Sequence, residues 1–599
     1  MLNNLTNNMI LRRITLAAIA ALCACACGET TEETQPVKLA SNPSELTFSS
    51  EGGKQELVIT TGIKPTVNCS DSWISLTEGA FADNTFHLEV NAQPNTGTTQ
   101  RTSSIRVIGD KQSLMVPVTQ GIAEVELTID KTALSFDRFG GADVVKVTSA
   151  QQPTAVSNCD WCGVEVGTIS DSTKETEITI SAAANRTKNA KTGTVTISCG
   201  SQSVTVNLSG DAGQDTPVAT TTEVTPEIAF NTLSLGWNMG NHMDAISNGV
   251  ASETVWGNPK CTQATMDGVK AAGFKSVRIC TTWEGHIGPG PAYIIEEKWM
   301  SRVEEIVGYA EKAGLVAILN THHDESYWQD ISKCYNNTTQ NEKVKDEIFC
   351  FWTQVANRFK EKGEWLMFES FNEIQDGGWG YSSAFLNNPD VQYKVLNDWN
   401  QVFVDAVRST GGNNATRWLG VPGYCASPTF TMAGLTVPND YTSANRILVA
   451  VHDYDPYEYT IKDPMLPRFG HTAESGTRPN GDNEAGLRYT FGKLKETYVD
   501  KGIPMYLGEF GCSRHNTADL PYQKYYMEYF CKAAADSGFP MLLWDNGATG
   551  TGPEHHPYID HGTGKFVDQT AKELVEIMVK AVTSTDPAYT LESVYNSAP

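Results

Sequence analysis

Two glutamates, Glu373 and Glu509, each close a short apolar segment, "WLMFESFNE" and "IPMYLGE". Cleavage of a glycosidic bond needs two carboxyl groups, one that protonates the leaving oxygen and one that attacks the sugar or activates water. A separation of about 5–5.5 Å would predict retention of configuration, and about 6.5–9.5 Å would predict inversion. A single glutamate of this kind is commonly a solvated rim residue, so the prediction depends on the pair and its neighbours.

Polar and aromatic residues also stand at the ends of the other apolar segments. One such residue would be unremarkable, but a set of them predicts a site. Arg278 is always charged and can keep a neighbouring carboxylate ionised, whereas an acid catalyst needs a raised pKa. The candidate substrate-binding and supporting residues are Asn238, Arg278, His322, His323, Asn372, His452, Tyr454 and Trp544, with Trp237 at a further segment end.

The stretch "HHD" at His322 and His323 could also be interpreted as a metal site. Adjacent side chains on a strand point to opposite faces, so we expect the two histidines to be a poor chelating pair. We therefore predict hydrolysis without a metal or any other cofactor. A second histidine-containing stretch, "EHH" at Glu554–His556, lies in a loop rich in Gly and Pro, where substrate contact and plain exposure are both open.

The elements that must position these residues follow from the pattern after Ile228. Eight short apolar segments alternate with amphipathic stretches such as 296–313 and 391–409, which predicts a (β/α)8 barrel. In that fold the catalytic residues stand at the carboxyl ends of several strands. A doubly wound sheet is the alternative, but no glycine-rich phosphate loop follows the first segment. The predicted strands are "SLGWN", "FKSVRIC", "LVAILN", "WLMFESFN", "RWLGVPG", "ILVAVHDY", "IPMYLGEF" and "MLLWDN".

Ten ordered motifs make the barrel region resemble a glycoside hydrolase family 5 endoglucanase, in the branch that acts on β-1,4-glucans and xyloglucan. They are "GWNMGNHMDA", "WGNP", "GFKSVRI", "TWEGHIG", "NTHHD", "FESFNEI", "GGNNATRWL", "VHDY", "GEFG" and "WDNG". The resemblance implies a retaining mechanism without metal, with Glu373 as the acid/base and Glu509 as the nucleophile. It implies that Asn372 holds the sugar's 2-hydroxyl and that Arg278 and Tyr454 keep the nucleophile ionised and placed. It also implies histidines lining the site at His322, His323 and His452, and a platform under the sugar at Trp544.

The chain departs from the family pattern at several positions. Ile374 and Cys280 stand where proline is usual or frequent, His242 where a small hydroxyl residue is common, and Asp453 is unusual. None of these changes removes a catalytic group. We expect His242 and the loop 471–486 to influence which glycan fits.

Two tandem all-β modules precede the barrel, at residues 37–121 and 125–211. Their motifs repeat, so that Cys69 and Cys159 lie 90 residues apart, and the alternating apolar positions predict short strands of β-sandwiches. The modules resemble BACON domains. Trp73 and Trp161 recur at one position, which favours core packing over sugar stacking, and we expect the modules to be spacers. Residues 212–226 are small and polar and are predicted to be a linker. In "CDWC" we expect incidental buried cysteines.

The first 25 residues predict a lipoprotein signal peptide, with Arg12 and Arg13 before a short apolar run. Small residues around Cys25 favour lipidation there rather than an ordinary secretory cleavage site, and Cys27 is the weaker acceptor. Translation is expected to begin at Met9. Residues 26–36 would form a tether, and the barrel domain would span 227–590. We expect the protein to be exported and anchored by its lipid in the outer membrane, facing the cell surface. The lipid anchor would be its only contact with the membrane.

The charge balance excludes some classes of partner. The 599 residues carry 45 basic and 70 acidic side chains, a formal net charge of −25, which disfavours nucleic acid and anionic lipid. A polysaccharide substrate and a monomeric enzyme fit better. The sequence therefore predicts a retaining endo-β-1,4-glucanase that acts on xyloglucan, mixed-linkage glucan or cellulose-type chains. The alternatives are an endo-β-mannanase on the same barrel and a non-catalytic surface protein that binds glycans.

Overall fold

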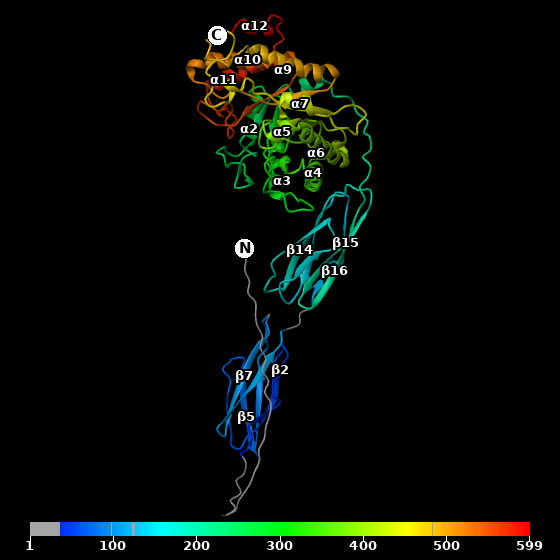
Figure 1. Cartoon of the computed structure of the whole chain (residues 1–599), viewed down its shortest axis with the longest axis vertical. Helices are drawn as coiled ribbons and strands as arrows, with labels where there is room; N and C mark the ends of the chain where they lie inside the picture. Colours follow the sequence, from blue (N-terminus) through cyan, green and yellow to red (C-terminus); the bar gives the residue numbers. More distant parts are fainter. Residues whose placement is uncertain (1–35, 98, 123–125, 482) are drawn as a thin grey trace, which may run out of the picture. The chain divides into compact units, whose positions relative to one another are not determined.

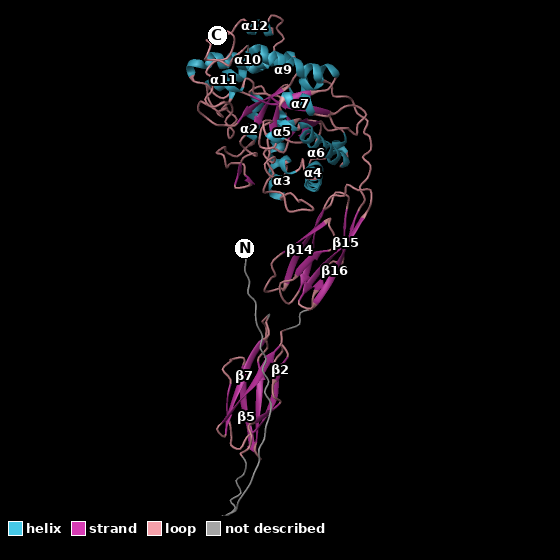
Figure 2. Ribbon diagram, viewed as in Figure 1, coloured by secondary structure: helices cyan, strands magenta, loops and turns pink. Residues whose placement is uncertain are grey.

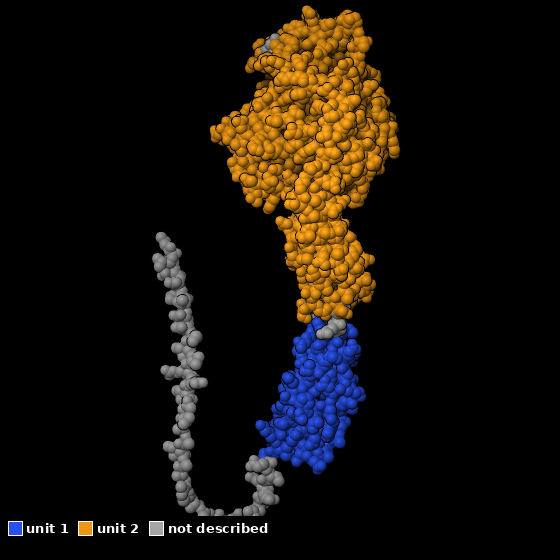
Figure 3. All heavy atoms as spheres, turned by 90° about the vertical axis from the view of Figure 1, so that its right-hand side faces the viewer, with its two compact units in different colours: residues 1–125 blue, residues 126–599 orange. Residues whose placement is uncertain are grey.

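The computed structural model describes residues 36–599, apart from residues 98, 123–125 and 482. The chain divides into two compact units, residues 1–125 and 126–599, which Figure 3 colours separately. The predicted signal peptide, its lipidation site Cys25 and nearly all of the tether lie outside the described residues. Within the described part, no helix combines the length and the apolar character that crossing a bilayer requires.

The first unit holds a sandwich of two four-stranded sheets, with strand orders β1-β3-β6-β5 and β2-β8-β7-β4. Its strands alternate buried and exposed residues, because one face of each sheet packs on the other. Leu57 and Ile59 of β3 pair with Leu88 and Phe86 of β6, and all four are fully buried. The strands are β1 Ala40–Asn42, β2 Leu46–Phe48, β3 Gly53–Thr60, β4 Thr66–Asn68, β5 Ile74–Ala82, β6 Thr85–Ala92, β7 Arg101–Gly109 and β8 Gln112–Gln120.

A second sandwich with the same design begins the second unit, with strand orders β10-β16-β15-β12 and β13-β14-β11-β9. Trp161 lies in its core and donates its indole N–H to the carbonyl of Thr192, and the matching Trp73 is covered by the Arg101 guanidinium, 4.7 Å from its ring centre. The strands are β9 Thr128–Ile129, β10 Ala133–Phe136, β11 Gly141–Thr148, β12 Thr154–Ser157, β13 Cys162–Val166, β14 Glu175–Ala182, β15 Lys191–Cys199 and β16 Gln202–Gly210.

The segment predicted as a linker is bound along the barrel. Ala219 bridges to Thr442, the N–H of Val224 donates to the carbonyl of Asn445, and Arg446 donates to the carbonyl of Thr222. The small polar residues of this segment predict a linker. The composition of the segment shows that it lacks the apolar pattern of a core-forming element. Backbone hydrogen bonds to the barrel do not require such a pattern.

Eight parallel strands close into a barrel in the order in which they occur in the chain, and all eight predicted segments form them. Figure 2 shows the strands enclosed by helices. The (β/α)8 prediction is therefore confirmed. The barrel strands are β17 Leu235–Met239, β20 Ser276–Ile279, β21 Val316–Leu319, β22 Leu366–Glu369, β23 Leu419–Pro422, β24 Ile447–His452, β25 Met505–Phe510 and β26 Met541–Asp545, and a hairpin of β18 Ile246–Ser247 and β19 Val250–Ala251 follows β17.

The helices surround this barrel, as the labels in Figure 1 show. Helix α1 starts at a Thr225 cap with proline in its first turn, and α3 ends at Gly314, which has a φ of 70° that glycine adopts without strain. The helices are α1 Pro226–Leu233, α2 Gln263–Ala271, α3 Glu297–Ala313, α4 Thr338–Arg358, α5 Ser383–Asn387, α6 Pro389–Ser409, α7 Pro428–Gly434, α8 Tyr457–Thr460, α9 Asn483–Thr497, α10 Leu520–Asp536, α11 Gln569–Thr583 and α12 Leu591–Tyr595.

The barrel interior is filled at the end opposite the strand termini that carry the candidate residues. Ala229 and Leu233 of α1, which leads directly into β17, pack in one cluster with inward residues of the strands such as Met367, Tyr506 and Leu542. A much larger apolar cluster lies between the strands and the outer helices, and it includes Val594 of α12, beyond the predicted domain end at residue 590. Because this end of the barrel is filled with apolar side chains, polar side chains can converge only at the opposite end, where the strands have their carboxyl ends.

Candidate active site

Glu373 and Glu509 meet at the carboxyl end of the barrel. Glu509 lies near the end of β25, and Glu373 follows β22 by four residues. The Nδ1 atom of His452, the last residue of β24, lies 2.7 Å from Oε1 of Glu373 and 3.7 Å from Oε2 of Glu509. One oxygen of each glutamate and one nitrogen of His452 all lie within 4.8 Å of one another. The sequence alone had left this separation open.

The environment drives the two carboxyl groups in opposite directions. Burial raises the pKa of Glu509, but the charges of His452 and Arg278 and hydrogen bonds from Tyr454 and Arg278 outweigh it, so its pKa lies below the ordinary value. Burial also raises the pKa of Glu373, and the negative charges of Glu509 and Glu325 raise it further. The hydrogen bond and the charge of His452 lower it, but not enough to offset burial, so the pKa of Glu373 lies above its ordinary value. Two neighbouring carboxyl groups with pKa values pushed apart are the signature of one ionised and one protonated partner.

Arg278 of β20 holds the nucleophile candidate in place. It is fully buried, and its Nη1 donates to Oε1 of Glu509 at 2.8 Å and to Oδ1 of Asn238 at 3.1 Å. Its Nη2 donates to Oδ1 of Asn372 at 2.6 Å. Because a guanidinium only donates, Asn372 must direct its oxygen at Arg278, which leaves the Asn372 amide NH₂ to donate elsewhere. Tyr454 donates to the other Glu509 oxygen at 2.9 Å.

A third carboxylate, Glu369 at the end of β22, was missed by sequence reasoning. It accepts from Nε and Nη2 of Arg278 at 2.9 and 2.6 Å, from Asn320 at 3.1 Å, and from the hydroxyl of Tyr506. Its side chain is buried. A charged residue inside the apolar run "WLMFES" was the available signal, since such a residue is buried only when it is paired.

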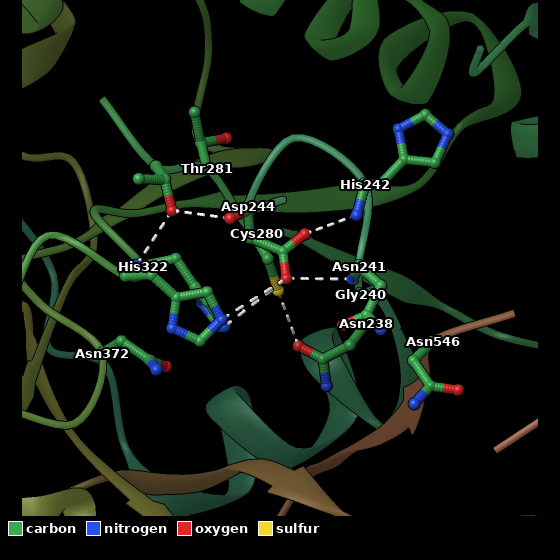
Figure 4. A network of polar contacts seen from close by, with 12 residues as sticks. Asn238, Gly240, Asn241, His242, Asp244, Cys280, Thr281, His322, Asn372 and Asn546 are labelled. Atoms are coloured by element: carbon green, nitrogen blue, oxygen red, sulfur yellow. Dashed lines mark hydrogen bonds and ion pairs between the residues drawn. The ribbon is translucent and has the colours of Figure 1, made fainter. Parts of the chain in front are cut away.

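Asp244 organises a second cluster beside the pair, drawn in Figure 4. Its carboxylate accepts from the backbone N–H groups of Asn241 and His242, and its Oδ2 lies 3.9 Å from Nε2 of His322 and 3.8 Å from Nε2 of His323. The expectation that the two histidines point to opposite faces is wrong. Strand β21 ends at Leu319, so the alternation rule no longer applies three residues later, and both rings turn to Asp244.

Among the residues that the structure describes, two groups have the donor types of a cation site: Asp244 with His322 and His323, and Glu373 with His452 and Glu509. In each group a carboxylate is already bound by strong donors: two backbone N–H groups at Asp244, and Arg278 and Tyr454 at Glu509. These donors already stabilise the negative charge of each carboxylate, which a bound cation would otherwise neutralise. The arrangement therefore fits proton transfer and sugar binding better than metal binding.

Other predicted site residues lie as follows. Trp544 is largely buried, and its ring stacks parallel to His322 with centroids 5.7 Å apart. Asn238 is fully buried and donates to the carbonyls of Gly508 and Leu542, so it supports Arg278 from below. Trp237 does not line the mouth: it is fully buried and donates to Asp545, because its position in β17 turns it to the helix layer.

The expected influence of His242 on the glycan is not supported by its position. The side chain is fully buried and turned away from Asp244, as Figure 4 shows, with its ring 5.6 Å from that of His561. Burial lowers the pKa of His242 to about 3, and His561 adds to this effect. In the "EHH" stretch, His556 is buried, and burial lowers its pKa to about 4, whereas Glu554 is exposed.

Residues 240–550 match the profile of the family described as cellulase (glycosyl hydrolase family 5), which is more than half of the chain. The chain belongs to glycoside hydrolase family 5. The family predicted from the ten motifs is thereby confirmed, and the chain is a glycoside hydrolase. Residues 64–121 and 151–208 match BACON, an N-terminal binding-domain family, which confirms the second resemblance.

Individual relatives agree with this family 5 assignment. Endoglucanase A of Paenibacillus barcinonensis is 34% identical over 333 residues, covering 53% of this chain and 82% of that protein. The structure of a GH5-4 broad specificity endoglucanase from Bacteroides salanitronis is 46% identical with a TM-score of 0.59, covering 61% of this chain and 97% of that one. A Bacteroides ovatus GH5 xyloglucanase in complex with a XXXG heptasaccharide is 25% identical with a TM-score of 0.55, covering 76% and 100%.

Proposed function

We propose that this family 5 enzyme is a retaining endo-β-1,4-glucanase that acts by double displacement, with Glu509 as the nucleophile and Glu373 as the acid/base. The observation that carries the proposal is the close approach of the two carboxylates, with oxygens within 4.8 Å of each other. That separation fits direct attack by one carboxylate and leaves too little room for the water that an inverting enzyme places between them.

In the first step, Oε of ionised Glu509 attacks the anomeric carbon while Glu373 gives its proton to the departing glycosidic oxygen. A glycosyl ester forms on Glu509, and the leaving chain departs with its oxygen protonated. In the second step, Glu373, now a carboxylate, removes a proton from water, which attacks the same carbon and frees Glu509. The pKa directions support these roles, because the nucleophile must be ionised and the acid protonated at the same pH.

The neighbours support the same assignment. Arg278 and Tyr454 each bind one oxygen of Glu509, so they orient it and keep it ionised. His452 contacts both glutamates and can stabilise each carboxylate as it forms; burial lowers its pKa, but Glu509 and Glu373 raise it more, and the result is a raised pKa. We assign the free amide NH₂ of Asn372 to the sugar's 2-hydroxyl and the ring of Trp544 to the sugar at the cleavage point. His322 and His323 complete the wall of the site.

The β-1,4-glucan substrate rests on the likeness to proteins whose names state endoglucanase and xyloglucanase activity. We further propose export with lipidation at Cys25, which anchors the enzyme at the cell surface. The −25 net charge suits a neutral polymer as substrate.

Two measurements test the proposal together. The purified enzyme should release reducing ends from xyloglucan, mixed-linkage glucan or carboxymethylcellulose, and activity confined to mannan would overturn the substrate assignment. Glu509→Ala should lose activity on every substrate and yield an inverted product with azide. Glu373→Ala should still form the glycosyl-enzyme from an aryl glycoside with a good leaving group, and azide should restore its turnover with retention. Labelling of Glu373 instead of Glu509 by a fluorosugar would reverse the roles.

A further inference from the structure

Glu554 stands at the barrel mouth and has no part in the proposed mechanism. Residues at two strand ends bind its backbone: its N–H donates to Oγ of Ser513 at 3.1 Å, and its carbonyl accepts from the amide of Asn546 at 2.8 Å. Ser513 lies three residues beyond β25, which carries Glu509, and Asn546 directly follows β26. Glu554 is therefore fixed between two loops that border the catalytic centre.

The backbone of Glu554 has an unusual conformation. Its φ of 58° lies in the left-handed region, which residues with a Cβ atom rarely adopt. Such a conformation persists only where the surrounding contacts enforce it, and residues of this kind are common at functional sites. The hydrogen bonds to Ser513 and Asn546 supply this constraint. They fix the direction in which the side chain of Glu554 leaves the loop.

The charge of Glu554 acts on both catalytic carboxyl groups. Desolvation raises the pKa of Glu554 most, the charges of Glu509 and Glu373 raise it further, and His555 lowers it. The effect is mutual, because two charges act on each other with the same energy. Burial raises the pKa of Tyr454, and nearby carboxylates that include Glu554 add to this effect. Glu554 is therefore close enough to act on a charge that is placed at the cleavage point.

The negative charge of Glu554 is not offset by a neighbouring cation. The side chain is exposed and forms no ion pair with any residue that the structure describes. Arg278 is fully buried and is already paired with two other carboxylates. By contrast, Glu325, another carboxylate of the mouth, lies 3.8 Å from Nδ1 of His323, which can offset its charge. A substrate that enters the mouth therefore meets the uncompensated charge of Glu554.

We propose that Glu554 is a specificity-determining residue that repels anionic polysaccharides from the cleavage point. An exposed carboxylate at the mouth raises the free energy of a bound chain that carries carboxyl groups, whereas it leaves a neutral chain unaffected. The residue acts through space and needs no contact with the sugar. The inference rests on the proposed glucanase function and adds to it the charge of the accepted substrate, a glucan without carboxyl substituents.

Two cellulose ethers test this proposal, neutral hydroxyethylcellulose and anionic carboxymethylcellulose. Glu554→Gln should raise kcat/KM for carboxymethylcellulose about threefold to fivefold at about 0.01 M salt, which is the range of one exposed charge interaction. It should leave kcat/KM for hydroxyethylcellulose unchanged. At about 1 M salt, where the screening length is about 3 Å, the gain on carboxymethylcellulose should disappear. Glu554→Asp keeps the charge and should match the wild type on both polymers.

Glu592→Gln is the matched control, because it removes the same charge from an exposed position on helix α12 and should not change the ratio of the two activities. An unchanged ratio in Glu554→Gln at low salt would overturn the inference. An equal change on both polymers would also overturn it, because it would indicate that the residue only supports its loop. A gain that persists at about 1 M salt would do the same, since an effect of charge is screened there. Inactivity of the unmodified enzyme on hydroxyethylcellulose would count against the proposed function instead.

Discussion

Replacing Glu369 with Gln tests whether the buried charge network holds the active site together. Arg278 is fully buried between Glu369 and Glu509, and Glu369 accepts two of its hydrogen bonds, at 2.9 and 2.6 Å. The change Glu369→Gln keeps the side-chain shape and removes one negative charge. In the variant, Glu509 would be the only carboxylate that forms an ion pair with the guanidinium of Arg278.

The expected cost follows from the loss of a buried ion pair. The guanidinium of Arg278 stays charged in the variant, so its bonds to the new amide oxygen remain charge-assisted and what is lost is the charge of the carboxylate. Breaking a buried pair by removing one partner costs roughly 3–5 kcal/mol, and the lower end applies because Glu509 still pairs with Arg278. We expect the free energy of unfolding to fall by about 3 kcal/mol. Urea unfolding, followed by tryptophan fluorescence, measures it.

The same substitution has a second readout with a defined sign. Glu369 competes with Glu509 for the charge of Arg278, so neutralising Glu369 should lower the pKa of Glu509 further. The acidic limb of kcat/KM should then move to lower pH. Glu311→Gln is the control, because Glu311 forms a half-exposed pair with Lys362 and should change stability by less than about 1 kcal/mol. An unfolding free energy within about 1 kcal/mol of the wild type, or a limb that moves to higher pH, would refute this reasoning.

The remaining predictions concern pH and the modules. Activity should follow a bell-shaped pH profile. On the acidic side it should fall as Glu509 is protonated, at a pH below the ordinary pKa of a glutamate. On the alkaline side it should fall as Glu373 loses its proton, at a pH above that ordinary pKa. Glu373→Gln should abolish the alkaline limb along with most turnover, and a profile whose alkaline limb survives would exclude Glu373 as the acid. A chain that starts at residue 126 keeps the whole second unit and should retain the KM of the full protein for polysaccharide, because the first unit is expected to be a spacer. A large rise in KM for polymer, with small glycosides unaffected, would mean that the first module binds glycan.

The barrel and the position of its active site follow from the amino-acid pattern. Eight apolar runs separated by amphipathic stretches can bury their side chains only as strands covered by helices, and closing the sheet brings every strand end to one mouth. That is why the sequence alone predicts that Glu373, Glu509, Arg278 and His452 belong to one site. The N-terminal repeat likewise predicted two sandwiches, because alternation with period two is a local property.

Contacts that depend on the direction of a side chain could be read only from the folded protein. The alternation rule fails where a strand ends, so His322 and His323 converge on Asp244 although a strand would separate them. Two further residues could not be placed from the sequence. Glu369 anchors Arg278, although it stands inside an apolar run. His242 is fully buried, although it stands in a motif of the site. The carboxylate separation, which carries the proposed mechanism, is set by the distance between β22 and β25 across the barrel. Burial and long-range pairing are properties of the closed barrel, and no local pattern contains them.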